Sequence, residues 1–65
     1  MQFSIQFVRF RRGVPEPIRT VPCHATDAQA ALEDGRKFRP PPQADGIRVL
    51  DSRGRCLKQW RVGDQ

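Results

Sequence analysis

The side chains best suited to nucleophilic or metal chemistry in this sequence are two cysteines and one histidine. Cys23 and His24 are neighbours, and Cys56 lies far from both along the chain. Neighbouring residues of a strand point to opposite faces, so Cys23 and His24 cannot work together as a dyad. A structural zinc site normally needs four ligands in closely spaced pairs, and this set supplies only three. We therefore expect no catalytic cysteine, no metal site and no cofactor.

The other residues that could carry catalysis also lack the necessary spacing. Seven carboxylates are present, but none shows the paired placement of an acid and a base. The five glycines are isolated at expected turns, so no glycine-rich phosphate loop is formed. A chain of 65 residues also has little core from which to build a deep pocket. The sequence predicts a protein that is not an enzyme.

The charge of the chain indicates which partners it can bind. Twelve Lys and Arg residues stand against seven Asp and Glu, which gives a net charge of +5. Most of the basic residues are arginines, whose planar guanidinium makes bidentate contacts with phosphates and carboxylates. Nucleic acid, an anionic membrane surface or an acidic protein would suit this charge, and so would a basic surface that only meets solvent.

The chain shows no signal for export or membrane insertion. Its first seven residues alternate between apolar and polar, which does not fit a secretory leader. No apolar stretch approaches the ~20 residues of a membrane span. Cysteines without a leader favour a reducing compartment and free thiols. We expect a cytoplasmic protein that does not bind membranes.

Period-two alternation at the N-terminus predicts a strand over residues 1–7, with Phe3, Ile5 and Phe7 on one buried face. Val8 and Phe10 fall on the opposite face, so either a bulge changes the phase or that face is partly covered at its end. Residues 11–17, with one glycine and two prolines, are expected to form a connection. Residues 18–25 follow as a second strand, placed at a sheet edge because of its proline at position 22.

A helix is expected next. Thr26 and Gln29 fit a capping box, in which each side chain bonds to the backbone of the other residue. Apolar or small residues then recur at helical spacing from Ala28 to Phe38. The helix is predicted to begin at Thr26 or Asp27 and to end between positions 34 and 38, before a proline-rich connector over residues 40–45. Its Leu32 should be buried against the sheet.

The segment 46–62 predicts a β-hairpin. Asp51, Ser52, Arg53 and Gly54 fit a type I turn with Gly54 in the left-handed region. Regular pairing beyond Asp51 and Arg55 places Leu50 opposite Cys56, Val49 opposite Leu57, Arg48 opposite Lys58 and Ile47 opposite Gln59. In that register Ile47, Val49 and Leu57 face the core, together with Leu32 and Ile5. The opposite face carries Arg48, Leu50, Cys56, Lys58 and Trp60.

These elements predict a single α+β domain over residues 1–65 with ββαββ order. Four antiparallel strands form one sheet, and the helix lies across one of its faces.

The other face of that sheet is the predicted binding site. Arg48 and Lys58 would supply phosphate contacts, Arg19 a further cation from the second strand, and Trp60 a stacking plane for bases. The predicted function is a small binding module, with nucleic acid as its partner. A second interpretation stays open: a protein–protein module, with an acidic protein or a second copy held at this face or at the strand that carries Pro22.

Three features together resemble a group of proteins. They are the Thr26–Gln29 capping box, the alanine-rich helix, and the closing hairpin with Asp51, Gly54 and Arg55. The chain resembles short uncharacterised bacterial proteins of ββαββ layout. This resemblance implies the same fold and a bacterial cytoplasmic setting. Those proteins have no agreed function, so it implies no activity.

Overall fold

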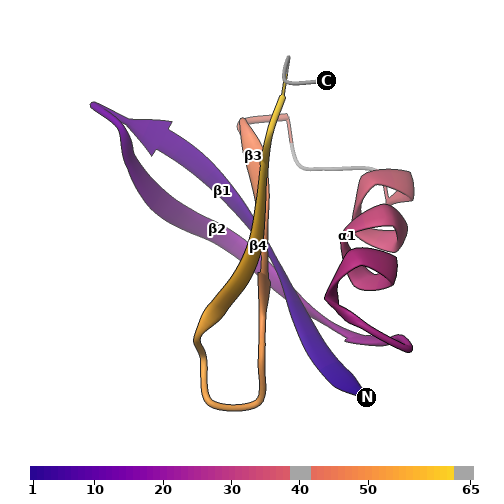
Figure 1. The fold of residues 1–65 in the computed structure, drawn as a ribbon. Helices are drawn as coiled ribbons and strands as arrows, with labels where there is room; N and C mark the ends of the chain where they lie inside the picture. The colour runs from indigo at the N-terminus through magenta and orange to yellow at the C-terminus, as the bar shows by residue number, and fades with distance from the viewer. Residues whose placement is uncertain (39–41, 63–65) are drawn as a thin grey trace.

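One antiparallel sheet and one helix make up the protein. The computed structural model describes residues 1–38 and 42–62, and the order of its elements is ββαββ. The elements are β1 (Gln2–Arg11), β2 (Val14–His24), α1 (Ala28–Lys37), β3 (Gly46–Leu50) and β4 (Cys56–Arg61). The strands lie in the order β2-β1-β3-β4, and Figure 1 shows α1 on one side of the twisted sheet. The predicted fold class is confirmed.

The core lies between α1 and the two central strands. Ile5 of β1 and Val49 of β3 are cross-strand partners, and both are completely buried. Leu32 of α1 belongs to the same apolar cluster, as predicted. Gly35 lets the helix come close, because a Cβ there would lie only 3.1 Å from the Cγ2 atom of Ile5. The helix therefore packs through a small-residue position onto the centre of the sheet.

Strand β2 is longer than the sequence predicted. The expected connection over residues 11–17 is wrong, because β1 and β2 meet through a turn at Arg12 and Gly13, whose φ angles are 54° and 80°. Pro15 and Pro17 lie inside β2. The sequence argument excluded prolines from a central strand, but the strand order places β2 at the edge of the sheet.

Hydrogen-bond direction explains how β2 accepts its prolines. The carbonyl of Val8 accepts from Asp45 on the β3 side, whereas Met1 exchanges bonds with Ala25 on the β2 side. Even-numbered residues of β1 therefore point their backbone groups at β3, and the β2 residues opposite them point theirs outward. Pro15, Pro17 and Pro22 all stand opposite even-numbered residues of β1, so none removes a bond from the sheet.

The helix begins one residue later than a capping box would require. Asp27 is the N-cap, and its Oδ1 accepts a hydrogen bond from Ala30 N–H at 2.8 Å. The predicted capping role of Thr26 is wrong, since the Asp27 carboxylate is the group that accepts from the first turn. Lys37 ends the helix inside the predicted window. Part of the predicted connector over residues 40–45 lies outside the described residues.

The apolar residues at the end of β1 lie on its second face because that face is covered there. No bulge within β1 changes the alternation of its side chains. Val8 and Phe10 face away from α1, and Val8 is completely buried there. The extra residue lies in β2, where Ile18 has no partner in the β1–β2 register. Of the two explanations that the sequence left open, the second, a face covered at its end, is confirmed.

Candidate functional site

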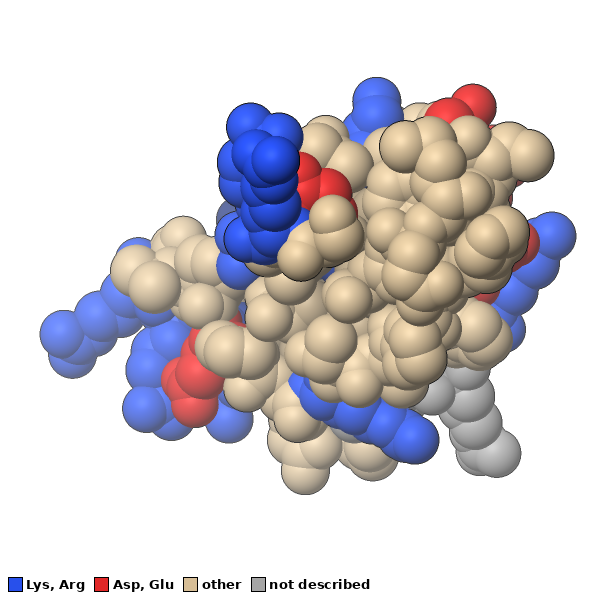
Figure 2. Space-filling model, turned by 90° about the horizontal axis from the view of Figure 1, so that it is seen from below, with Lys and Arg blue, Asp and Glu red and all other residues tan. Residues whose placement is uncertain are grey.

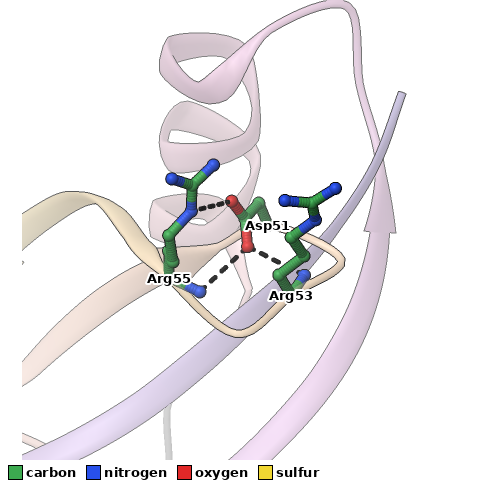
Figure 3. A network of polar contacts seen from close by, with 3 residues as sticks. All are labelled: Asp51, Arg53 and Arg55. Atoms are coloured by element: carbon green, nitrogen blue, oxygen red, sulfur yellow. Dashed lines mark hydrogen bonds and ion pairs between the residues drawn. The ribbon is translucent and has the colours of Figure 1, made fainter.

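The β3–β4 turn has the predicted structure. Asp51 N–H donates to the carbonyl of Arg55 at 2.9 Å, and Gly54 has a φ of 83°. The Asp51 carboxylate accepts from the backbone N–H groups of Arg53 and Arg55 and from the Arg55 side chain, as Figure 3 shows. The Arg55 N–H, followed by the other donors, lowers the pKa of the Asp51 carboxyl despite some desolvation. The turn is thus stabilised by one partly buried carboxylate.

Beyond the turn, the observed register differs from the predicted one. Leu50 pairs with Cys56 as expected, but Val49 then pairs with Lys58. Leu57 is an extra residue, a β-bulge, and every later residue of β4 is shifted by one position. Arg48 consequently pairs with Gln59 and not with Lys58, so the predicted like-charge pair is wrong. The predicted burial of Leu57 is also wrong, since its side chain is exposed.

This shift moves two predicted site residues to the other face. Cross-strand partners point to the same side of a sheet, so Lys58 and Trp60 share the α1 side with Val49 and Ile47. The Arg36 guanidinium of α1 lies over the Trp60 ring, 4.9 Å from its centroid. Trp60 also packs against the apolar cluster. Its predicted place on the face opposite the helix is wrong.

Arg19 lies on the helix side as well. It pairs with Phe7, whose side chain belongs to the core. With Phe7, Val21 and Phe38 it lines a groove of about 320 Å³ beside the end of α1. Arg48 is thus the only one of the four predicted site residues on the face turned away from α1.

We call the face turned away from α1 the open face, and the pairing registers define its members. It carries two arginines and no Asp or Glu among its paired residues. The members are Gln2, Ser4, Gln6, Val8, Phe10, Pro15, Pro17, Thr20, Pro22, His24, Gly46, Arg48, Leu50, Cys56, Gln59 and Arg61.

Arg48 is held near the middle of the open face. Its Nη1 donates to the side-chain oxygen of Gln6, its partner on β1, at 3.0 Å. Its Nε is buried and has no hydrogen-bond partner among the described residues. A guanidinium fixed in this way loses little side-chain entropy when it contacts an anion.

The second arginine of the open face is stacked on an aromatic ring. The Arg61 guanidinium lies over Phe10, 4.8 Å from the ring centroid. The Phe10 ring in turn covers Gly46, where a Cβ would lie 2.6 Å from the ring. Arg61 and Arg48 are diagonal neighbours across β3 and β4, a relation that places Cα atoms roughly 7–8 Å apart.

Sequence reasoning missed this arginine–aromatic pair. Phe10 was recognised only as a residue out of phase with its strand, and Arg61 falls on this face only after the shift at Leu57. The available signal was Gly46, whose missing side chain in a paired position indicates that something lies close to the backbone there.

The charges of the protein form several groups. Figure 2 views the molecule from below and shows separate groups of Lys and Arg around an uncharged central surface. One of these basic residues, Arg11, forms a loose ion pair with Glu16 at 3.8 Å, and both side chains are largely exposed. Attraction to anions is therefore spread over the surface. The open face differs from the rest because its paired residues include arginines and no Asp or Glu.

The cysteines of the chain are free thiols. Cys23 is buried on the α1 side of β2, where desolvation and then the nearby charge of Asp34 raise its pKa. Cys56 is exposed on β4, and its Sγ donates to the carbonyl of Lys58 at 3.3 Å. Within the described residues, no three His, Cys, Asp or Glu side chains gather to hold a metal ion. None of the helices in that part of the chain is long and apolar enough to cross a membrane.

Comparison with known proteins adds no family to these observations. No protein-family model, curated protein or solved structure matches the chain.

Proposed function

We propose that this protein is a small, non-enzymatic binding module that holds single-stranded nucleic acid against the open face. The observation that carries the proposal is the composition of that face, which presents Arg48 and Arg61 and no carboxylate among its paired residues. The net charge of +5 adds a long-range attraction for polyanions.

Each arginine has a distinct part in this proposal. Arg48, ordered by Gln6, contacts a phosphate. Arg61 presents the outer side of its guanidinium plane to a nucleobase while its inner side rests on Phe10. Lys58, Trp60 and Arg19 take no direct part, because their pairing directs them toward α1.

The test is a titration with a mixed-sequence single-stranded oligonucleotide at several salt concentrations. Arg48→Gln should weaken binding and lower the slope of log affinity against log salt by about 0.7, the contribution of one phosphate contact on a single strand. Lys58→Gln is the matched control, since it removes the same charge from the opposite face. Equal effects of the two variants would show that only the overall charge matters and would overturn the proposal.

Trp60 provides a second, independent readout. It is the sole tryptophan, and the chain has no tyrosine. An oligonucleotide on the open face should leave Trp60 emission nearly unchanged, because the ring lies on the other side of β4 beneath Arg36. Strong quenching by stacked bases would locate the nucleic acid on the α1 side and contradict the proposal.

We also propose that the protein acts in the cytoplasm. Support comes from its cysteines, both of which are free and lie on opposite faces of strands at the two edges of the sheet. Two thiols kept apart in this way suit a reducing compartment.

A further inference from the structure

The two edges of the sheet differ in their ability to accept another strand. Five residues of β2 direct their backbone groups outward, since they stand opposite even-numbered residues of β1. Three of these five are prolines, which have no N–H to donate. The five are Pro15, Pro17, Thr20, Pro22 and His24. This edge is therefore closed to strand pairing.

The outer edge of β4 has its donors in place. Val62 N–H donates to the Asp45 carbonyl at 2.7 Å, and this bond lies beside the Gly46–Arg61 pair. That arrangement marks the pair as non-hydrogen-bonded, so the backbone groups of Arg61 point away from β3. By alternation the same holds for Gln59, whereas Lys58 and Trp60 bond to β3. After the bulge at Leu57, β4 thus presents a regular outer edge without proline.

An apolar groove runs beside this edge on the α1 side. It measures about 210 Å³ and is lined by Arg36, Phe38, Ala44, Gly46, Ile47, Trp60 and Val62. Its size suits a single apolar side chain better than a drug-sized ligand. Phe38 and Val62 are 45% and 58% exposed, so apolar surface is available at its rim. A strand added to β4 would direct every second side chain toward this groove.

The charged side chains of β4 itself, Lys58 and Arg61, are both basic. Between positions 52 and 62 the chain carries Arg53, Arg55, Lys58 and Arg61 and no acidic residue. Arg36 adds a further cation at the groove. Among the described residues, Arg55 is the only one of these cations with a carboxylate partner, Asp51. An approaching strand with acidic side chains would meet complementary charge on both faces.

We propose that the outer edge of β4 binds an extended, acidic segment of a partner protein as an added strand. Backbone groups of Gln59 and Arg61 pair with the segment, an apolar side chain enters the groove beside Trp60, and acidic side chains on the other face of the segment meet Arg61. The proposal shares Arg61 with nucleic-acid binding, but it depends on the outer edge of β4 and on the groove of the α1 side.

A second copy of the chain is a poorer occupant of the same edge. Self-pairing of β4 would bring the Lys58 and Arg61 side chains of two copies together, each copy with a net charge of +5. Basic residues on an edge strand oppose such pairing. An acidic strand is favoured because its carboxylates would attract Lys58 and Arg61, whereas the basic side chains of a second copy would repel them.

The test uses a short synthetic peptide of alternating Glu and Val residues, with Trp60 emission as the signal. We expect a saturable change in emission that weakens as salt is added, together with slower amide exchange at Gln59 and Arg61. A peptide of alternating Lys and Val is the control for charge. If the acidic peptide gives no saturable change, or the basic peptide gives an equal one, the proposal is wrong.

Two matched proline variants separate strand pairing from simple charge attraction. Gln59→Pro removes one outward N–H from β4 and should weaken peptide binding roughly tenfold, as expected for a lost hydrogen bond and an added ring. Thr20→Pro makes the same change on the edge of β2 and should leave binding unchanged. Peptide binding by Gln59→Pro that equals the parent would overturn the proposal.

The oligonucleotide distinguishes the two proposals from each other. Arg48→Gln should leave peptide binding intact, and Gln59→Pro, whose side chain lies on the open face, should weaken oligonucleotide binding much less than it weakens peptide binding. If Gln59→Pro weakens both ligands equally, the edge attracts polyanions in general and the strand-addition proposal fails. Circular dichroism of each variant establishes that it is folded.

Discussion

At the scale of single residues, Gly46 occupies a crowded backbone position in the sheet. A Cβ there would lie 2.6 Å from the Phe10 ring and 2.7 Å from the carbonyl oxygen of Trp60. The ring can move, but the carbonyl belongs to the neighbouring strand and cannot do so without disturbing the pairing. The absence of a side chain at Gly46 therefore allows the Phe10 ring, which Arg61 covers, to pack against the start of β3.

We expect Gly46→Ala to destabilise the protein by about 1–3 kcal/mol, the usual range for an overpacked site. Urea denaturation followed by Trp60 emission measures the change. A second comparison introduces Gly46→Ala into the Phe10→Ala variant, which lacks the ring. Gly46→Ala should still destabilise that variant, since the contact with the Trp60 carbonyl remains. No loss of stability in either background would contradict the crowding seen at this position.

The helix N-terminus gives a second prediction for single residues. Asp27→Ala should lower the free energy of unfolding by about 1 kcal/mol, because the Asp27 carboxylate bonds to Ala30 N–H. Thr26→Ala, the neighbouring control, should change it by less than ~0.5 kcal/mol, as expected for an exposed residue outside the cap. Thermal or urea denaturation of both variants tests the assignment, which a larger effect at Thr26 would reverse.

At the scale of elements, the sequence contains enough to identify the helix, the β3–β4 turn and all four strands, but not the first residues of β2. Apolar alternation identifies β1, and Asp51 with Gly54 identifies the turn, since both signals act over a few residues. The bulge at Leu57 was not predictable, because Val49 can pair with either Leu57 or Lys58 without changing the turn. Tertiary packing decides between them by placing Trp60 against α1.

That one-residue shift is why the candidate site was only partly predictable. Side chains alternate faces with a period of two, so one extra residue exchanges the faces of everything after it. Lys58 and Trp60 therefore moved to the α1 side, while Arg48, which precedes the bulge on the partner strand, stayed on the predicted face. The prolines of β2 were misjudged for a related reason: the direction of their backbone groups depends on the partner strand.

Amide hydrogen exchange distinguishes the two registers directly. In the observed register, the N–H groups of Lys58 and Trp60 bond to β3, and those of Gln59 and Arg61 face outward. We expect slow exchange at the first two and fast exchange at the last two in the free protein. Regular pairing without a bulge predicts the reverse alternation, so slow exchange at Gln59 would reject the observed register.

At the scale of the whole molecule, positive charge is spread over the surface with little compensation. The net charge is +5, and the ion pairs found among the described residues are Arg11–Glu16 and Arg55–Asp51. Both pairs are at least partly exposed, so they contribute little to stability. Mutual repulsion of the remaining cations opposes folding to a compact state.

Moderate sodium chloride should therefore stabilise this protein. Screening of the repulsion should raise the free energy of unfolding by about 0.5 kcal/mol, the scale of surface charge interactions. Urea denaturation at low and physiological ionic strength measures the effect. The double variant Arg53→Glu with Lys58→Glu lowers the net charge from +5 by four to +1 and should lose most of the salt dependence. A parent protein destabilised by salt would contradict this view of its surface.

The bulges also show where the chain can lose one residue without losing its fold. Ile18 in β2 and Leu57 in β4 are the residues without partners in the registers of their strands, and both side chains are exposed. Deleting Leu57 would leave each pair from Gly46–Arg61 to Val49–Lys58 as it is and would only make the ladder continuous. The two edge strands thus contain positions where a one-residue deletion keeps the fold and both faces, whereas a deletion within β1 would misalign the sheet on both sides.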